Sequence, residues 1–557
     1  MLAGCASSGI PTNGTTPGAS TPAVPSQPKR IVAAVLSTPP ALSQKLVASS
    51  AIRGGNEIEA LANAGLTVAD QQGHLHAQLA DAVPTIENGL WQILPEGRML
   101  TTWKIHAGAA WHDGVPFTAE DLVFSATVDQ DAALPIQPNP AYRSIESITA
   151  PDADTLVITW NAPYINADSL FGSFVPGSSS GSSLPIPKHL LERPFTSDKS
   201  SFADLPYWST EFIGTGPFKV SEWVQGEHLL LDANDQYVLG RPKIDQIDVR
   251  FIPDQNTLLS NVLADSVDLS LGKSVSFEQA QAARGQWQDG RVDIAPANPL
   301  IIFPQMQQAY ENPAVVGDVR FRRALYSSID RQQIVETLLG GLSTVADGAV
   351  LPSDPYYEAV KPSIVQYPYD PGRAAQNLQV LGYTRGPEGQ LRDGAGQPLS
   401  LEFRTVDVDI DTKTLFIVTQ MWEQLGISVT PYVMPPQQAQ DLQYHYTFPA
   451  FEVLRNPPIF TNYVSAQVKR PENGWRGSQE GGFSNVQYDD IVDRYLRTIP
   501  TDQRYELAAE AIHLISDQLA VMPLFYDVDP NLITNRLHGV AGAVGNTWNA
   551  ADWDVTS

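Results

Sequence analysis

The sequence predicts a mixed α/β fold, and three observations support this. Segments with an apolar residue at every second position alternate with segments whose apolar residues recur at helical spacing. We find no repeat of fixed period, which argues against solenoids and propellers. The 557 residues, 43% of them hydrophobic, are enough for several units with packed cores.

Two helices are predicted from their capping residues. Thr118 can cap the first backbone amides of a helix, and Asp121 follows three residues later, so a helix is expected to run through Val128. Asp330 begins a second helix in the same way, and the glycine pair at Gly340 should end it.

Strands are predicted between these helices. In residues 245–253, Ile247, Val249 and Phe251 share one face and charged residues the other, as in a half-buried strand. Residues 265–271 repeat this alternation nearby, so both segments are expected to be strands.

A long amphipathic helix is predicted near the C-terminus, after Thr501. Its apolar positions follow helical spacing: Ala508, Ala511, Ile512, Ile515 and Leu519. These elements are expected to be structural.

Charge and hydropathy exclude some classes of partner. There are 35 Lys and Arg against 61 Asp and Glu, a net charge of −26, which repels phosphate backbones and anionic lipid surfaces. No nucleic-acid partner is therefore expected. No apolar run is long enough to span a bilayer.

Cys5, the only cysteine of the sequence, closes Leu-Ala-Gly-Cys, which resembles a bacterial lipobox. Residues 6–28 are almost entirely Ser, Thr, Gly, Pro and Ala, the composition of a flexible tether. We therefore expect lipidation at Cys5 and attachment to the membrane through the lipid. Only Met1 precedes the motif, so the secretory signal is expected to be missing, truncated or misannotated.

Two motifs that could indicate catalysis lack the sequence context that catalysis requires. Residues 177–181 match the G-x-S-x-G pattern of serine hydrolases but lie in a Ser- and Gly-rich loop rather than a strand-to-helix turn. Residues 271–274 are similar to the end of a phosphate loop, yet Val267 stands where its first glycine is required. The sequence thus predicts no catalytic residues, no cofactor and no enzyme.

The candidate metal ligands also form incomplete sets. Asp407, Asp409 and Asp411 have the spacing of a calcium loop, but Thr412 replaces the required glycine and Val418 the required glutamate. A second pair, His74 and His76, has no further ligand at a matching spacing. No metal site is expected.

Several motifs in a fixed order carry a resemblance to a known family. The strongest is residues 103–125, with the pattern W-H-D-G-x-P-F-T-A-x-D, and further matches lie at residues 214–219, 319–331, 421–427 and 523–526. The chain resembles family 5 extracellular solute-binding proteins of ABC importers, the dipeptide- and oligopeptide-binding group.

This resemblance implies a two-lobed periplasmic-binding-protein (flytrap) fold with an extra subdomain on the main lobe. After the lipobox and tether at 1–28, the implied parts are the main lobe at 28–60, 205–295 and 525–557, the extra subdomain at 61–204, and the second lobe at 297–524. Crossovers at 298–305 and 523–528 would form the hinge.

The implied function is that of an extracytoplasmic, lipid-anchored receptor. It would be a monomer that captures a peptide-like solute between its lobes and delivers it to a membrane permease whose ATPase is a separate protein. Alternatives are import of a non-peptide solute such as an oligosaccharide, an extracellular hydrolase, and a chaperone-like or signalling receptor without a transport partner.

The expected ligand site departs from the family pattern. Peptide binders tend to carry a D-x-x-D-P motif whose first aspartate pairs with the ligand ammonium, but here that position falls on Val453 or Leu454, followed by the cation Arg455. Either Glu452 or Asp407 binds the ammonium group of the ligand, or the ligand has no free N-terminus. The predicted ligand-binding residues are Arg404, Asp407, Phe451, Glu452, Arg455, Asn456, Tyr463 and Trp475.

Overall fold

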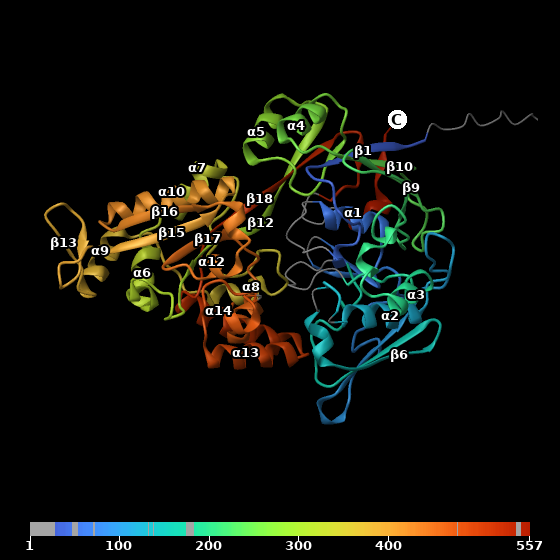
Figure 1. Cartoon of the computed structure of the whole chain (residues 1–557), viewed down its shortest axis with the longest axis horizontal. Coiled ribbons are helices and arrows are strands. Elements are labelled where there is room, and N and C mark those ends of the chain that lie inside the picture. Colours follow the sequence, from blue (N-terminus) through green and yellow to red (C-terminus); the bar gives the residue numbers. More distant parts are fainter. Residues whose placement is uncertain are drawn as a thin grey trace, which may run out of the picture.

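The computed structural model describes residues 28–46, 54–70, 73–131, 133–136, 139–173, 183–475, 477–541 and 547–556. They form two lobes joined by a pair of long strands (Figure 1). The first lobe contains most of the N-terminal half of the chain, and the second lobe contains most of the C-terminal half. The predicted two-lobed α/β fold is therefore present.

Among the described residues, the largest sheet has ten strands and runs through both lobes. In spatial order these are β16 (Ser428–Met434), β15 (Ser400–Val406), β17 (Phe451–Arg455), β12 (Gly290–Pro304), β18 (Met522–Thr534), β11 (Leu269–Ser270), β1 (Arg30–Val35), β10 (Gln246–Phe251), β9 (His228–Ala233) and β8 (Phe218–Val224). We call β12 and β18, which pair antiparallel, the central ribbon.

The central ribbon overlaps both crossovers expected to form the hinge. Its register shifts between Pro296 and Pro299, and irregularities of this kind bend a strand. β17 pairs antiparallel with β12, and β11 pairs antiparallel with β18, so one strand from each lobe lies beside the ribbon.

The first lobe packs α1 (Gly55–Ala62) against the β1 half of the sheet. The predicted strand at 245–253 is confirmed as β10, with Ile247, Val249 and Phe251 buried. The strand predicted at 265–271 is shorter than expected. Asp265 adopts a positive φ of 54° in a turn, so regular pairing begins only at Leu269.

A smaller sheet forms the subdomain beside the first lobe. In the described part of the chain it has four strands, in the order β4 (Trp91–Ile93), β5 (Met99–Lys104), β7 (Thr155–Trp160) and β6 (Ile145–Asp152). Trp103, Trp111 and Trp160 lie at the centre of its core with almost no exposed surface. Burial of such large rings makes this subdomain a well-packed unit.

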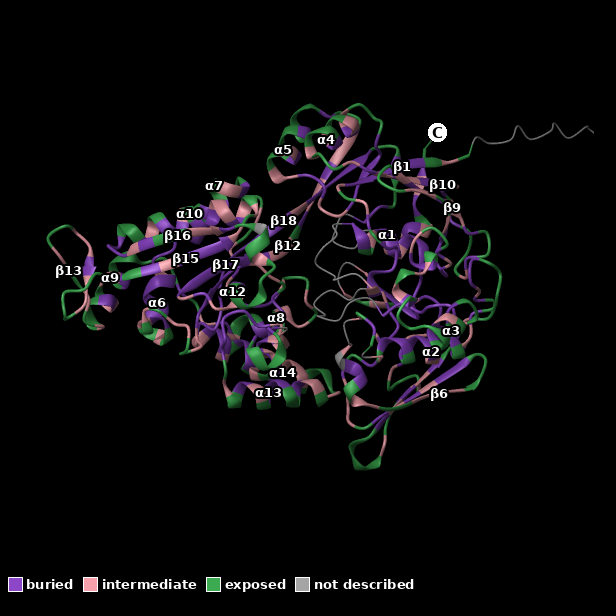
Figure 2. Cartoon of the chain, in the orientation of Figure 1, coloured by how far each residue is buried: buried purple, intermediate pink, exposed green. Residues whose placement is uncertain are grey.

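The second lobe packs helices against the β15 half of the sheet. Its core centres on Trp422 of α10 (Asp409–Gln424), whose ring lies 4.8 Å from Phe403 and 5.2 Å from Phe451. A further group, α13 (Val486–Arg497) and α14 (Thr501–Asp517), faces the subdomain (Figure 1). In both lobes the sheet strands are largely buried, whereas the outer helices carry exposed faces (Figure 2).

The remaining helices and strands connect these layers. The helices are α2 (Ala119–Asp129), α3 (Lys188–Ser197), α4 (Gln255–Leu263), α5 (Phe277–Gln286), α6 (Val319–Ser327), α7 (Arg331–Leu339), α8 (Tyr357–Val360), α9 (Pro371–Val380), α11 (Pro436–Ala439) and α12 (Leu442–Tyr446). The strands are β2 (Thr67–Ala69), β3 (Leu75–Ala77), β13 (Thr384–Arg385), β14 (Leu391–Arg392), β19 (Leu537–His538) and β20 (Asp554–Val555).

The helices predicted from capping residues are confirmed. α2 begins with a capping box in which the backbone N–H of Thr118 donates to Asp121 over 2.9 Å. α7 is capped by Asp330 and ends at Gly340, which has a left-handed conformation. The predicted C-terminal helix is α14, but it ends at Asp517, so the buried Leu519 lies beyond it.

Candidate functional site

The candidate site lies where the carboxyl ends of strands from both lobes reach the central ribbon. In open α/β sheets, ligands bind outside the carboxyl ends of parallel strands. β17 ends at Arg455, and the backbone N–H of Asn456 donates to Pro299 of β12 over 3.1 Å. Lys273 follows β11 from the other lobe and has a left-handed φ of 53°.

Asp527 of β18 joins these two strand ends. Its Oδ2 accepts hydrogen bonds from Arg455 Nη1, at 2.9 Å, and from Lys273 Nζ, while Oδ1 accepts from the Val528 N–H at 2.8 Å. The Asp527 side chain is only 3% exposed, whereas Arg455 retains 26% and Lys273 21% of side-chain exposure. A buried carboxylate therefore holds one partly exposed cation from each lobe.

Further titratable groups surround this bridge. Burial raises the pKa of Asp411 to about 6 although the positive charge of Arg455 opposes the shift. Burial raises the pKa of Glu57, in the first turn of α1, to about 7, and the nearby negative charge of Asp529 adds to it. Burial also lowers the pKa of Lys273, against the attraction of Asp527. Both signs of charge thus meet at the ribbon.

Two predicted ligand residues lie instead inside the second lobe. Arg404 and Glu452 are cross-strand partners in β15 and β17, with Arg404 Nε and Glu452 Oε1 3.5 Å apart. His445 Nε2 lies 3.2 Å from the same oxygen. Glu452 has no exposed surface, so its carboxylate faces these two cations rather than the space between the lobes.

The Arg404 guanidinium also makes contacts with residues other than Glu452. Its guanidinium donates to the carbonyls of Tyr444 and His445 and lies 5.1 Å from the ring centroid of Phe448. Burial by itself lowers the pKa of His445, but the hydrogen bond to Glu452 and the negative charge of that residue outweigh it, so the pKa is raised. Arg404, Glu452 and His445 form a buried ion cluster.

The predicted aromatic residues are buried too. Phe451 packs on Trp422 in the second-lobe core. Tyr463 is 3% exposed and Trp475 8%, the latter with a positive φ of 62°. Asp407, by contrast, is exposed just beyond β15. Of the predicted ligand residues, Arg455 and Asn456 lie at the end of β17, where Arg455 contacts Asp527. Phe451 and Glu452 pair with β12 but are buried in the second lobe, and the other four lie elsewhere in that lobe.

The two lobes also meet away from the ribbon. Ile165, in the subdomain segment after β7, packs among apolar residues of α13 and α14, and its backbone N–H donates to Leu496 over 3.2 Å. Nearby, burial raises the pKa of Asp168 to about 6 although the charge of Arg504 in α14 opposes this. The two lobes thus contact each other both at the ribbon and through this segment.

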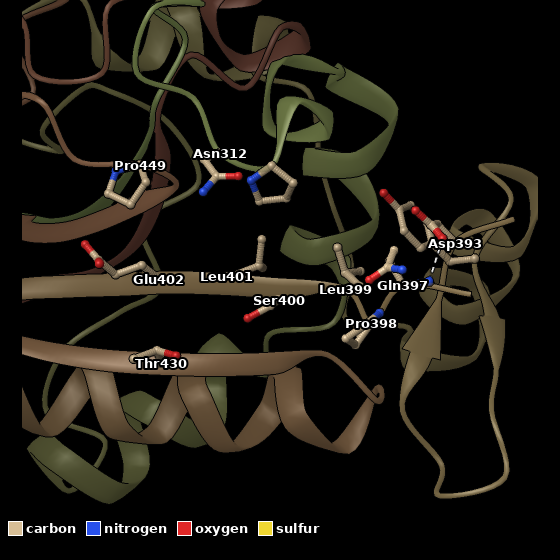
Figure 3. Close-up of a pocket in the computed structure, with 12 residues that line it drawn as sticks. Asn312, Asp393, Gln397, Pro398, Leu399, Ser400, Leu401, Glu402, Thr430 and Pro449 are labelled. Atoms are coloured by element: carbon tan, nitrogen blue, oxygen red, sulfur yellow. Dashed lines mark hydrogen bonds between the residues drawn. The ribbon is translucent and has the colours of Figure 1, made fainter. Parts of the chain in front are cut away.

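A separate pocket of about 440 Å³ lies at the opposite end of the second lobe (Figure 3). Ser400 and Glu402 of β15 and Thr430 of β16 line it, with Asn312 and Asp393 from adjoining segments. It lies at the amino ends of the parallel strands, opposite to the strand ends that reach the ribbon. We therefore do not assign it to the candidate site.

The described part of the chain contains neither a metal-binding cluster nor a membrane-spanning helix. His74 and His76 both approach Asp70, at 3.3 Å and 2.9 Å, but no group of three or more His, Cys, Asp or Glu side chains could hold a metal ion there. Within the same residues, no helix is long and apolar enough to cross a membrane. The G-x-S-x-G match at 177–181 lies entirely outside the described residues, as does Cys5.

Comparison with known proteins decides the family. Residues 88–465 match the model of bacterial extracellular solute-binding proteins, family 5. The chain belongs to this family. The family 5 chain is 23% identical over 481 residues to the oligopeptide-binding protein AppA of Bacillus subtilis, covering 82% of this chain and 80% of AppA.

Solved structures share the fold of this family 5 protein. AppA of Bacillus subtilis in complex with a nonapeptide has a TM-score of 0.72 at 19% identity, covering 96% of this chain and 100% of that one. The periplasmic EDTA-binding protein EppA has a TM-score of 0.77 at 15% identity, covering 95% and 97%. The family comprises ABC-transporter solute-binding proteins rather than catalysts.

The sequence analysis did not assign Lys273, Asp527, Asp411 or Glu57 to the ligand site of this family 5 protein, and it weighed Asp411 only as a calcium ligand. Asp527 had a recognisable signal, since this buried charge directly follows the apolar and aromatic run 522–526 of β18. Buried charges are normally paired, so a partner could have been sought. Which cations pair with it depends on strand order, which the sequence does not display.

Proposed function

We propose that this protein is the extracytoplasmic receptor of an ABC importer, which captures a peptide-like solute between its two lobes and delivers it to a membrane permease. Family membership and the peptide-binding relatives support the proposal. The observation that carries it is the convergence of Arg455 and Lys273, one from each lobe, on Asp527 of the central ribbon. A solute bound there contacts both lobes, which couples binding to closure.

A second candidate is a non-peptide anionic solute such as a metal chelate. EppA is named for EDTA binding, and another neighbour of similar fold, NikA of Brucella suis, was solved with Fe(III)-EDTA. Arg455 and Lys273 can donate to an anionic ligand group, and the apolar Val453 and Leu454 stand where an acid would pair with an ammonium group. The oligosaccharide alternative needs exposed aromatic faces, and Phe451, Tyr463 and Trp475 are buried.

We also propose the domain division implied by the sequence: tether to 28, main lobe at 28–60, 205–295 and 525–557, subdomain at 61–204, and second lobe at 297–524. In support, the core around Trp103 draws chiefly on the proposed subdomain. The core around Trp422 draws chiefly on the proposed second lobe. The monomeric state and the separate ATPase are part of the same proposal.

The proposal is tested by adding a random pentapeptide library with free termini to protein purified without denaturation. Native mass spectrometry should show one bound peptide per chain, recovered intact. Small-angle scattering should show a smaller radius of gyration at saturation. Ligand at 100 times its Kd should add about 2.7 kcal/mol to the free energy of unfolding. An unchanged radius at saturation, or hydrolysed peptides, would contradict the receptor function.

A lipid on Cys5 is proposed as the membrane anchor. Replacing Cys5 by serine should move the protein from the membrane fraction to the soluble fraction of the producing bacterium, because lipid attachment to the thiol is lost. Ser8→Ala, in the same tether, is the matched control and should stay with the membrane. Mature wild-type protein with an unmodified Cys5 thiol would contradict the anchor.

A further inference from the structure

The pocket at the far end of the second lobe lies over the amino half of one face of β15 and β16 (Figure 3). Because side chains alternate along a strand, Ser400 and Glu402 point to this face, while Leu401 points to the second-lobe core. Thr430 of β16 is the register partner of Glu402. α12 covers the same face further along, where it accepts hydrogen bonds from Arg404. The amino half is left as a pocket of about 440 Å³.

Two hydrogen-bonded loops form the walls of this pocket. On one side, the Asn312 N–H donates to the Pro449 carbonyl over 2.7 Å. On the other side, the Asp393 N–H donates to the Gln397 carbonyl over 2.9 Å, and Asp393 Oδ1 accepts from the Gln397 N–H over 2.8 Å. Backbone groups hold both walls in place, so the pocket is preformed. Its volume lies within the usual range for small-molecule sites.

The polar side chains in the pocket have acceptors to spare. Within the part of the chain that the structure describes, the side chains of Glu402, Ser400 and Thr430 make no hydrogen bond or ion pair. Asp393 Oδ1 accepts N–H groups of its own turn, whereas Oδ2 has no hydrogen bond to any described residue. A molecule that brings hydrogen-bond donors therefore finds unoccupied oxygen atoms.

The charge in the pocket is negative. Glu402 and Asp393 line it, and no described Lys, Arg or His does. Arg404, which follows Glu402 on the same face, faces the Glu452 carboxylate at 3.5 Å. Arg392, beside Asp393, donates to a backbone carbonyl of the same turn over 2.9 Å. Burial raises the pKa of Glu402 against the positive charge of Arg404, as expected of a carboxylate without a counter-charge of its own.

The two carboxylates lie at opposite ends of the pocket (Figure 3). Pro398 bridges to the strand that leads into Asp393. From Pro398 to Glu402 the chain spans about 13 Å, at roughly 3.3 Å per residue of extended backbone. A compact cation can reach only one of these acids. A linear molecule with ammonium groups along its length can reach both.

We propose that this pocket is a second ligand site, which takes a linear aliphatic polyamine with one ammonium group at Glu402 and another at Asp393. An ammonium is a compact point charge with three donors, so it suits separate acceptors at the two ends. The hydroxyls of Ser400 and Thr430 accept from amine groups between them. The methylene chain contacts the proline rings that line the pocket, Pro313, Pro398 and Pro449.

This site is independent of the proposed receptor function. It lies at the amino ends of β15 and β16, away from the strand ends that reach the ribbon. A polyamine bound there contacts only the second lobe, so it has no differential affinity for open and closed arrangements of the lobes. Its binding should therefore leave the radius of gyration unchanged.

The test titrates the purified chain with spermine, 1,4-diaminobutane and butylamine by calorimetry, in salt at about 0.15 M. Salt at this level screens the general attraction of cations to a chain with a net charge of −26. We expect one spermine per chain, bound at least ten-fold more tightly than 1,4-diaminobutane, which is too short to reach both carboxylates. Butylamine should bind more weakly still, and small-angle scattering should be unchanged by spermine.

Variants locate the bound spermine. Glu402→Gln and Asp393→Asn should each weaken its binding at least ten-fold, because each removes one charge and keeps the shape. The side-chain oxygen of asparagine can still accept the N–H groups of the turn, so the wall is retained. Ser400→Arg should abolish binding, since it places a cation in the pocket. Glu388→Gln, at an exposed position before the same turn, is the matched control and should bind like the wild type.

Several results would overturn the polyamine site. One is the absence of spermine binding to the wild type. Another is an equal loss in Glu402→Gln and Glu388→Gln, which would show that spermine binds the acidic surface in general. Binding that persists in Ser400→Arg, or a smaller radius of gyration with spermine, would place the probe elsewhere in the chain. Peptide capture is measured separately with the pentapeptide library, so these results leave the receptor function untouched.

Discussion

Replacing Glu452 by glutamine is expected to destabilise the second lobe by about 3–5 kcal/mol, the usual cost of breaking a buried ion pair by removing one partner. Glu452 is fully buried and is the carboxylate that faces both Arg404 and His445. Glutamine has nearly the same shape, so the loss is one of charge rather than of volume. Arg404 would remain buried without a counter-charge.

The measurement is hydrogen exchange of peptides from β15 and β17, supported by urea unfolding of the whole chain. Exchange by local and global opening reports stability near the substitution, which matters in a protein with several packed units. Glu472→Gln, at an exposed position, is the control and should change stability by less than about 0.5 kcal/mol. Equal protection in wild type and Glu452→Gln would contradict a stabilising role for the cluster.

The same cluster predicts a pH dependence. The pKa of His445 is raised in the folded state, so folding favours its protonated form. This contribution is fully present below the unfolded pKa of about 6.5 and is lost as the pH rises through the higher folded pKa. The stability of the wild type should therefore fall over that interval, whereas Glu452→Gln should lack this part of the decline. Parallel pH profiles for the two proteins would contradict the assignment.

Replacing Ile165 by alanine is expected to weaken solute binding by about ten- to hundred-fold. Ile165 is 8% exposed and packs against the α13 and α14 group of the other lobe. Burial of an isoleucine side chain contributes about 1.5–3 kcal/mol, and this is gained only when the lobes meet. The substitution should thus act on the closed state and raise the dissociation rate of the solute.

Stopped-flow dissociation and calorimetry with the bound pentapeptide check this expectation. The free energy of unfolding without peptide should change little, since the contact joins lobes rather than stabilising either core. Ile86→Ala, at a site 46% exposed, is the matched control and should bind like the wild type. An unchanged dissociation rate in Ile165→Ala would show that this contact does not contribute to closure.

Local features of the fold could be predicted because their causes are local. The capping box of α2 joins Thr118 and Asp121, three residues apart, and the left-handed Gly340 ends α7 within the same short segment. The alternation that predicted β10 is likewise contained within its own residues. Backbone hydrogen bonds and side-chain periodicity that involve only a few neighbouring residues can be predicted from the sequence.

The predicted site residues could not be placed from local sequence patterns, because their contacts join segments that are distant in the sequence. Arg404 and Glu452 are charged types that suit ligand binding, yet they lie side by side in neighbouring strands and compensate each other in the interior. The order of residues in the sequence does not predict the pairing of Arg404 with Glu452. It depends on β15 lying next to β17 in register, and on the burial that removes water from both charges.

The sequence by itself determined the α/β class, the capped helices and membership of the solute-binding family, because these depend on short-range hydrogen bonds, periodicity and motif order. Only the tertiary structure decided which charges meet at the ribbon. Lys273, Arg455 and Asp527 belong to three distant segments, and their contacts follow from the strand order β17-β12-β18-β11. Electrostatic interactions act through space, so long-range strand pairing had to be known before these residues could be recognised as one site.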